Sequence, residues 1–129
     1  MESSLDRLSY ETIGACIEVH SHLGPCLLES AYEEAVLHEL HLRGLSCERQ
    51  VTFPARYKEL VLPVSYRIDI LVERQIVLEL KTVERLLPVH AAQILTYLRV
   101  GQLPLGLLIN FNSATLRGQI QRYVRSAAL

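Results

Sequence analysis

The sequence predicts an α/β (α+β) fold in which helices flank a central mixed sheet. Three observations predict it. The first 44 residues carry two helical patterns, residues 47–83 contain three segments with strand character, and another helical pattern precedes an apolar run near residue 105. Helices and strands in this order pack as helices on the faces of one sheet. The length of 129 residues fits a single domain spanning 1–129.

Two amphipathic helices are expected first. Residues 10–22 carry apolar side chains at helical spacing, and the Leu-Gly-Pro sequence at 23–25 ends that helix. A broad apolar arc predicts a second helix over residues 28–43, with Gly44 as its stop.

Three strands are expected next, at residues 47–53, 62–72 and 76–83. The turn-like sequences Arg-Tyr-Lys-Glu at 56–59 and Glu-Arg-Gln at 73–75 separate them. This part of the chain therefore supplies an antiparallel group of strands to the sheet.

A third helix is expected to start at Pro88, to run to Arg99 and to be capped by Gly101. Residues 104–111 then form a short apolar run typical of a buried strand. Residues 116–129 are compatible with either a strand or a helix. A strand, a helix and a strand in succession predict a right-handed crossover between two parallel strands.

Three charged residues lie among the aliphatic residues of two neighbouring strands: Asp69, Glu79 and Lys81. Side chains alternate between the faces of a strand, so Glu79 and Lys81 share one face. The opposite face of the preceding strand is expected to hold Ile68, Ile70 and Val72. A three-residue loop pairs Ile70 with Leu78 and so puts Asp69 opposite Glu79, whereas a two-residue loop sets Glu79 against isoleucines. We therefore expect the two acids to face each other.

Two carboxylates opposite each other lie within about 5 Å at Cβ and repel unless a cation joins them. Mg²⁺ or Mn²⁺ suits ligands that are all oxygen. Lys81, on the same face, could stabilise the negative charge of an attacked phosphate. The alternative is a structural ion pair between Lys81 and one acid on an exposed face, and the spacing alone does not separate the two.

Polar side chains on two of the expected helices favour the site. Glu29 and Glu39 lie within the apolar arc of the second helix, and an acid that faces protein needs a partner. The arc does not by itself single out Glu29. On the third helix, His90, Gln93 and Tyr97 form a polar stripe at i, i+3 and i+7. Each alone could be an ordinary core or edge residue, but together they could line one cleft with the acids.

The formal net charge of −1 argues against a protein that binds nucleic acid through bulk charge alone. Residues 85–129 nevertheless hold five arginines and no acid, so this part either faces phosphates or carries solvated side chains. Three cysteines without a CxxC pair indicate neither a disulfide framework nor a thiolate zinc site. Without an export signal or a membrane-spanning apolar run, a cytoplasmic protein with no membrane association is expected.

Five sequence blocks in order resemble the GxxExxY protein family within the PD-(D/E)XK nuclease superfamily. The blocks are EVHSHLGPCLLESAY (18–32), YRIDILVE (66–73), IVLELK (76–81), HAAQILTYL (90–98) and GLLINFN (106–112). The resemblance extends from about Ile13 to Arg122. It implies a restriction-endonuclease-like αβββαβ core.

The resemblance also implies roles for individual residues. Asp69 and Glu79 would be metal ligands, with the carbonyl of Leu80 as a further ligand, and Lys81 would be the catalytic lysine. Glu29 resembles the helical acid that completes the metal site in RecB-like and λ-exonuclease-like members. The implied activity is hydrolysis of phosphodiester bonds in DNA, or less favourably RNA, with Mg²⁺ or Mn²⁺ as cofactor.

Gln93 and Tyr97 match the QxxxY element of the same branch, which lies near the substrate, and His90 belongs to the same block. One residue departs from the family: its first glycine is Cys26 here, so the motif reads CxxExxY. If that glycine serves a left-handed turn, the cysteine is strained there.

Two other functions remain open at this point. The first is a catalytically silent module that keeps the fold and binds nucleic acid or protein. The second is an assembly in which a homodimer or a larger protein partner supplies surface that a short chain lacks. Loss of Lys81 would leave the function of a silent module unchanged, which distinguishes it from an enzyme.

Overall fold

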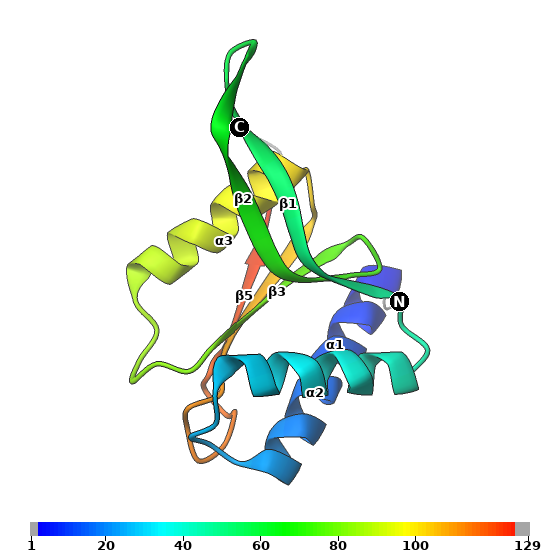
Figure 1. The fold of residues 1–129 in the computed structure, drawn as a ribbon. Coiled ribbons are helices and arrows are strands. Elements are labelled where there is room, and N and C mark those ends of the chain that lie inside the picture. The colour runs from blue at the N-terminus through cyan, green and yellow to red at the C-terminus, as the bar shows by residue number, and fades with distance from the viewer. Residues whose placement is uncertain (1–2, 126–129) are drawn as a thin grey trace.

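The computed structural model describes residues 3–125, which form three helices and a five-stranded sheet (Figure 1). The elements in chain order are α1 (Ser4–Leu23), α2 (Glu29–Leu42), β1 (Cys47–Tyr57), β2 (Leu60–Val72), β3 (Ile76–Lys81), α3 (Pro88–Gly101), β4 (Leu105–Asn110) and β5 (Ile120–Val124). This confirms the α/β prediction. No helix within residues 3–125 is long and apolar enough to cross a membrane.

The sheet has the order β1-β2-β3-β4-β5. β3 and β4 are parallel and joined through α3, while the other neighbouring pairs are antiparallel, which confirms the mixed sheet. The ambiguous stretch after residue 116 contains β5, which pairs with β4; residues 126–129 lie outside the described part.

Several element ends differ from expectation. α1 begins at Ser4, because the Ser3 side chain accepts a hydrogen bond from the Asp6 N–H at 3.0 Å and caps the helix. β3 ends at Lys81, two residues early. Gly101 is the last residue of α3 and not its cap, since Gln102 takes the left-handed conformation (φ 53°, ψ 46°).

The β1–β2 hairpin is longer than expected and projects beyond the helices (Figure 1). Arg56 pairs with Val61 and Tyr57 with Leu60, so the turn is only Lys58 and Glu59. Tyr57 and Leu60 are exposed. Because the hairpin tip packs on no core, its sequence lacks the apolar alternation that marks a half-buried strand.

Two apolar layers hold the helices on opposite faces of the sheet. α1 and α2 pack against side chains that include Ile70, Leu78 and Leu107. α3 packs on the other face against residues that include Val77 and Leu108. The cleft described below opens where β2 and β3 part, on the α3 face.

The loop between α1 and α2 carries the family's substituted position. Cys26 has a φ of 73°, in the left-handed region, which confirms that a glycine would suit this turn. A side chain with a Cβ costs about 1 kcal/mol in this conformation. Cys26→Gly is therefore expected to raise the free energy of unfolding by about 0.5 kcal/mol in urea denaturation at neutral pH, after subtraction of the entropy that the freer unfolded chain gains.

Gly24 in the same loop supplies the reverse control. Its φ of 69° and ψ of −173° are accessible to glycine almost alone, and a Cβ there would meet no heavy atom within 4 Å. Gly24→Ala should thus lower stability through backbone strain only. If Cys26→Gly lowered stability as well, strain at Cys26 would be ruled out.

Candidate functional site

The backbone hydrogen bonds between β2 and β3 end early. Beyond that point, hydrogen bonds to the carboxylates of Asp69 and Glu79 link the two strands. Ile70 pairs with Leu78, as the three-residue loop predicts, but no backbone pair follows beyond these residues in the described ladder. Instead the Asp69 N–H donates to Oε2 of Glu79 at 2.7 Å. The Leu80 N–H donates to the Asp69 carboxylate in return. Side-chain oxygens thus replace strand pairing, and Asp69 lies beside Glu79 as expected.

One face assignment on β2 was wrong. Ile70 and Val72 pack with α1 and α2, but Ile68 belongs to the α3 layer. The change of face occurs at Asp69, whose position opposite on β1 is held by Gln50 with a φ of 54°. A left-handed residue interrupts the regular pleat, so the sheet turns at this level.

A cavity of about 470 Å³ opens at the point where the strands part. It is lined by Glu29, Ser65, Tyr66, Arg67, Asp69, Glu79, Lys81, Gln93 and Tyr97. These residues come from α2, β2, β3 and α3, and six of them were expected to form a site. The structure thereby brings the proposed ligands, the lysine and the QxxxY pair to one cleft.

The two acids in the cleft are costly to ionise. Burial raises the pKa of Glu79 to about 8, and the neighbouring Asp69 charge adds to this effect. Burial also raises the pKa of Asp69 to about 6, together with repulsion from Glu29. The positive charge of Lys81 lowers both pKa values but does not cancel the rise. Lys81 therefore does not fully compensate the negative charge of the two carboxylates. A divalent cation bound between them would supply the missing positive charge.

Lys81 lies close to these acids without being bound to either. Within residues 3–125, Lys81 forms no ion pair. Its main chain is held in place, because the Phe111 N–H donates to the Lys81 carbonyl at 2.8 Å. The buried Asn110 side chain bonds both the N–H and the carbonyl of Val83, which turns the chain at the end of β3. Among the described residues, Lys81 therefore forms no structural ion pair of the kind considered as the alternative, and its side chain lines the cleft.

Tyr97 on α3 lies near the two carboxylates. Its side chain is only 6% exposed, and burial raises its pKa, with the Glu79 and Asp69 charges as the next causes. A side-chain hydrogen bond with Gln93 lowers the pKa of Tyr97 and so opposes this rise. The ring of Tyr66 on β2 meets the ring of Tyr97 edge to face, with centroids 6.2 Å apart. Both members of the QxxxY pair thus border the cleft.

His90 is placed differently from Gln93 and Tyr97. Its Nδ1 accepts a hydrogen bond from the Leu87 N–H at 2.9 Å, at the start of α3. It is not among the residues that line the cleft. The helical spacing was correct, but the first turn of the helix needs acceptors for its free N–H groups, and His90 meets that need.

Glu29 reaches the cleft from the first residue of α2 and is half-buried. The motif tyrosine fixes the loop in front of it. Tyr32 is fully buried; its hydroxyl donates to the Gly24 carbonyl and accepts from the Leu27 N–H at 3.2 Å. Glu39, the other acid of the arc, pairs with Arg43 at 2.9 Å away from the cleft. In the CxxExxY motif, Tyr32 therefore holds the loop between α1 and α2 in place, and Glu29 faces the cleft.

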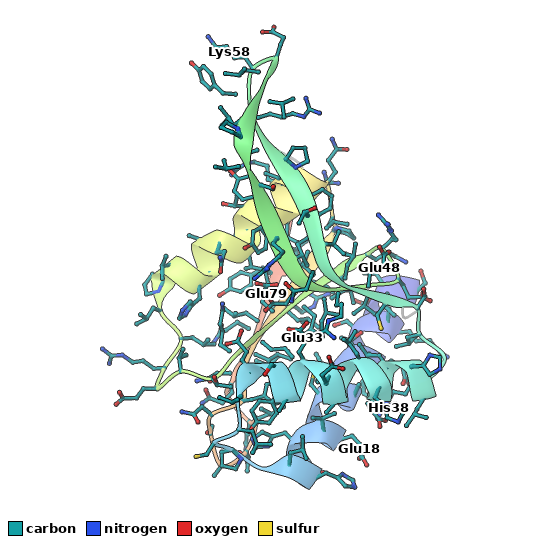
Figure 2. The ribbon with its side chains drawn as sticks, in the orientation of Figure 1. Glu18, Glu33, His38, Glu48, Lys58 and Glu79 are labelled. Carbon is teal, nitrogen blue, oxygen red and sulfur yellow. The ribbon has the colours of Figure 1, made fainter. Side chains whose placement is uncertain are left out.

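Glu33 is an acid near the site that sequence reasoning missed. It points from α2 toward the strands that carry Glu79 (Figure 2), and its charge raises the pKa of Asp69. Glu33 is buried, accepts a hydrogen bond from Gln50 at 3.0 Å and pairs with Arg49 at 3.2 Å. Its position one turn after Glu29 on the same helix was the available signal.

The donor set fits a magnesium-type ion better than a transition metal. Within residues 3–125, no three histidine, cysteine or acidic side chains are grouped to hold a metal. Asp69 and Glu79 supply two carboxylates, and the Leu80 carbonyl faces the same side as its N–H, toward Asp69. Mg²⁺ is commonly held by one or two carboxylates and completes its shell with water. The residues present are sufficient for such an ion.

Comparisons with known proteins give one positive result. A family model described as PD-(D/E)XK nuclease superfamily matches residues 6–123. Searches among curated proteins and among solved structures found no match. The matched range contains every residue that lines the cleft.

Proposed function

Because the chain belongs to the PD-(D/E)XK nuclease superfamily, we propose that it hydrolyses phosphodiester bonds of nucleic acid in the cleft between α2, β2, β3 and α3. The observation that carries the proposal is the arrangement at the end of the β2–β3 ladder. Two carboxylates that resist ionisation adjoin a lysine without an ion pair among the described residues. A purely structural cluster would be expected to neutralise its charges internally.

Asp69 and Glu79 would hold Mg²⁺ or Mn²⁺, with the Leu80 carbonyl and Glu29 as the further oxygen ligands near them. When bound, such an ion supplies Lewis-acid chemistry that stabilises negative charge on a phosphate. The hydrogen bond from the Asp69 N–H to Glu79 keeps that carboxylate in one orientation. The protein itself therefore contributes two carboxylates that are held in place, with Glu79 buried and Asp69 half-buried.

Lys81 would act on the substrate directly. Its ammonium group can donate a hydrogen bond to a non-bridging oxygen of the phosphate and offset the charge that grows there during attack. Gln93 and Tyr97 border the same cleft and would orient the substrate through their amide and hydroxyl groups. The Tyr97 hydroxyl stays protonated, since its pKa is raised further above its ordinary value.

Finer assignments follow from the motif blocks. We propose that the chain is a single domain of the GxxExxY family and that it acts on DNA rather than RNA. The free cysteines, Cys16, Cys26 and Cys47, suit a reducing compartment such as the cytoplasm.

The test pairs a metal titration with a cleavage screen. Mg²⁺ and Mn²⁺ titrated into the wild type should give binding heat that Asp69→Asn abolishes. Asp6→Asn, the same chemical change at an exposed residue that does not line the cleft, should leave that heat intact. In the screen, single-stranded DNA, duplex DNA and RNA are each incubated with protein and Mg²⁺. Absence of binding heat in the wild type would refute the metal site, and absence of cleavage of all three would refute the nuclease.

A second candidate function has one observation in its favour. The described residues contain no group of three metal-binding side chains, so a nucleic-acid-binding module without turnover is also compatible with the cleft. In that case Asp69→Asn would leave nucleic-acid affinity unchanged and no metal would be needed. The same titration and screen therefore separate the two functions.

A further inference from the structure

A second cavity adjoins the cleft and carries positive charge. Its volume is about 410 Å³, and it is lined by Phe53, Pro54, Arg56, Tyr66, Arg99 and Val100. Tyr66 lines both cavities, so they meet at its side chain. The residues that line the second cavity come from the β1–β2 hairpin and from the last turn of α3, whose positions in the fold are seen in Figure 1.

Three arginines without an ion pair gather around these two cavities. Arg56, Arg67 and Arg99 have no acidic partner within residues 3–125. All three are exposed. Elsewhere on the surface, Arg43, Arg49, Arg74 and Arg122 each pair with an acid, whereas Arg85, Arg117 and Arg125 are unpaired among the described residues but line neither cavity. A set of cations without acids along one path is what a polyanionic strand would need.

We propose that this second cavity binds a backbone phosphate of a single nucleic-acid strand, away from the phosphate that is attacked. Arg56 and Arg99 contact the phosphate, and the Tyr66 ring lies beside a neighbouring base. The inference rests on the proposed function, since it extends the substrate path from the catalytic cleft. It names contacts that neither the motif blocks nor the superfamily match assigns.

Distance and side-chain chemistry favour a single strand. Tyr66 precedes Asp69 by three residues of β2, which corresponds to on the order of 10 Å along the strand. Such a separation spans only a few nucleotides. Tyr66 is half-buried, so part of its ring remains open, and aromatic rings bind unpaired bases by stacking. Arg67 follows Tyr66 directly on β2 and lines the first cleft, where it adds a second positive charge to that of Lys81.

Another explanation of Arg99 accounts for only part of the observation. It lies in the last turn of α3, where a cation is favoured by the helix dipole. That effect does not explain Arg56, which lies on a different element and lines the same cavity. Two guanidinium groups that line one cavity offer donors that can bind a single anion from two sides. A phosphate satisfies both.

The experiment measures binding of a labelled single-stranded DNA oligonucleotide by fluorescence anisotropy as the salt concentration is varied. Proteins carry the Lys81→Ala background, so that the strand stays intact in Mg²⁺. Arg56→Ala combined with Arg99→Ala should weaken binding about tenfold and reduce the slope of log K against log salt by about 0.7, because one phosphate is no longer neutralised. Replacing both by lysine retains the charges and should retain most of the slope.

Arg117→Ala is the matched control. Arg117 is also exposed and has no ion pair among residues 3–125, but it lies on the β4–β5 loop, outside both cavities. An unchanged slope in the Arg56/Arg99 double variant, or an equal loss in Arg117→Ala, would overturn the inference. If the double variant loses slope but wild-type protein cleaves no nucleic acid, the nuclease proposal fails and this contact stands.

Discussion

Lys81→Ala is expected to slow phosphodiester cleavage by about 10²–10³-fold while metal binding persists. The ammonium group lies near Asp69 and Glu79 without an ion pair in the described part of the chain, so its removal takes away a donor to the substrate and breaks no structural contact. The cleavage rate at saturating substrate and Mg²⁺ measures the effect. Calorimetry on the same variant checks that the metal still binds.

Lys58 is the matched control for this variant. It is the other lysine of the chain, at the tip of the β1–β2 hairpin far from Glu79 (Figure 2). Lys58→Ala should cleave at the wild-type rate. Lys81→Met keeps the length of the side chain and removes only its charge, so it should be as slow as Lys81→Ala. Full cleavage activity in Lys81→Met would eliminate Lys81 from the mechanism.

Glu79→Gln is expected to stabilise the metal-free protein at pH 8, by on the order of 2 kcal/mol, and to have little effect near pH 5. The folded-state pKa of Glu79 is raised to about 8, above its ordinary value of 4.5. The folded protein thus holds this proton more tightly than the unfolded chain. The associated stability is present below pH 4.5 and is lost as the pH rises through 8. A glutamine stays neutral and can still accept the Asp69 N–H.

Urea unfolding at both pH values, with EDTA and with Mg²⁺, measures this effect. Mg²⁺ should raise the free energy of unfolding of the wild type at pH 8. The increase should be much smaller for Glu79→Gln, because this variant lacks one metal ligand. Glu33→Gln is the contrasting control: Glu33 is buried but pairs with Arg49 and Gln50, so its neutralisation should lower stability. A loss of stability in Glu79→Gln at pH 8 would contradict the view that the ionised Glu79, buried beside Asp69, destabilises the metal-free protein.

The superfamily was predictable from sequence, because its residues occur as short blocks with fixed spacing. The family match over residues 6–123 confirms the superfamily expected from those blocks. The register of the central hairpin was also predictable. A one-residue slip would turn Glu79 and Lys81 toward the apolar layer beneath α1 and α2, so the cost of burying those charges selects the pairing of Ile70 with Leu78.

Element ends were less predictable where no core contact marks them. The hairpin extends past residue 53 because backbone pairing continues where side chains are exposed. Similarly, the α3 cap at Gln102 and the capping role of His90 depend on backbone geometry at helix ends. Helical periodicity carries little information about such positions.

The amino-acid sequence was enough to predict the order of elements up to β4, the facing acids and six of the nine residues that line the cleft, through local spacing, one buried face and the motif blocks. The folded chain was needed to show that Lys81 has no ion pair among the described residues, that Glu33 pairs with Arg49, and that Tyr66 lines both the cleft and the cavity of Arg56 and Arg99. Those facts depend on which side chains from distant segments meet. Charge pairing is decided by distance in space, and spacing along the chain does not fix that distance.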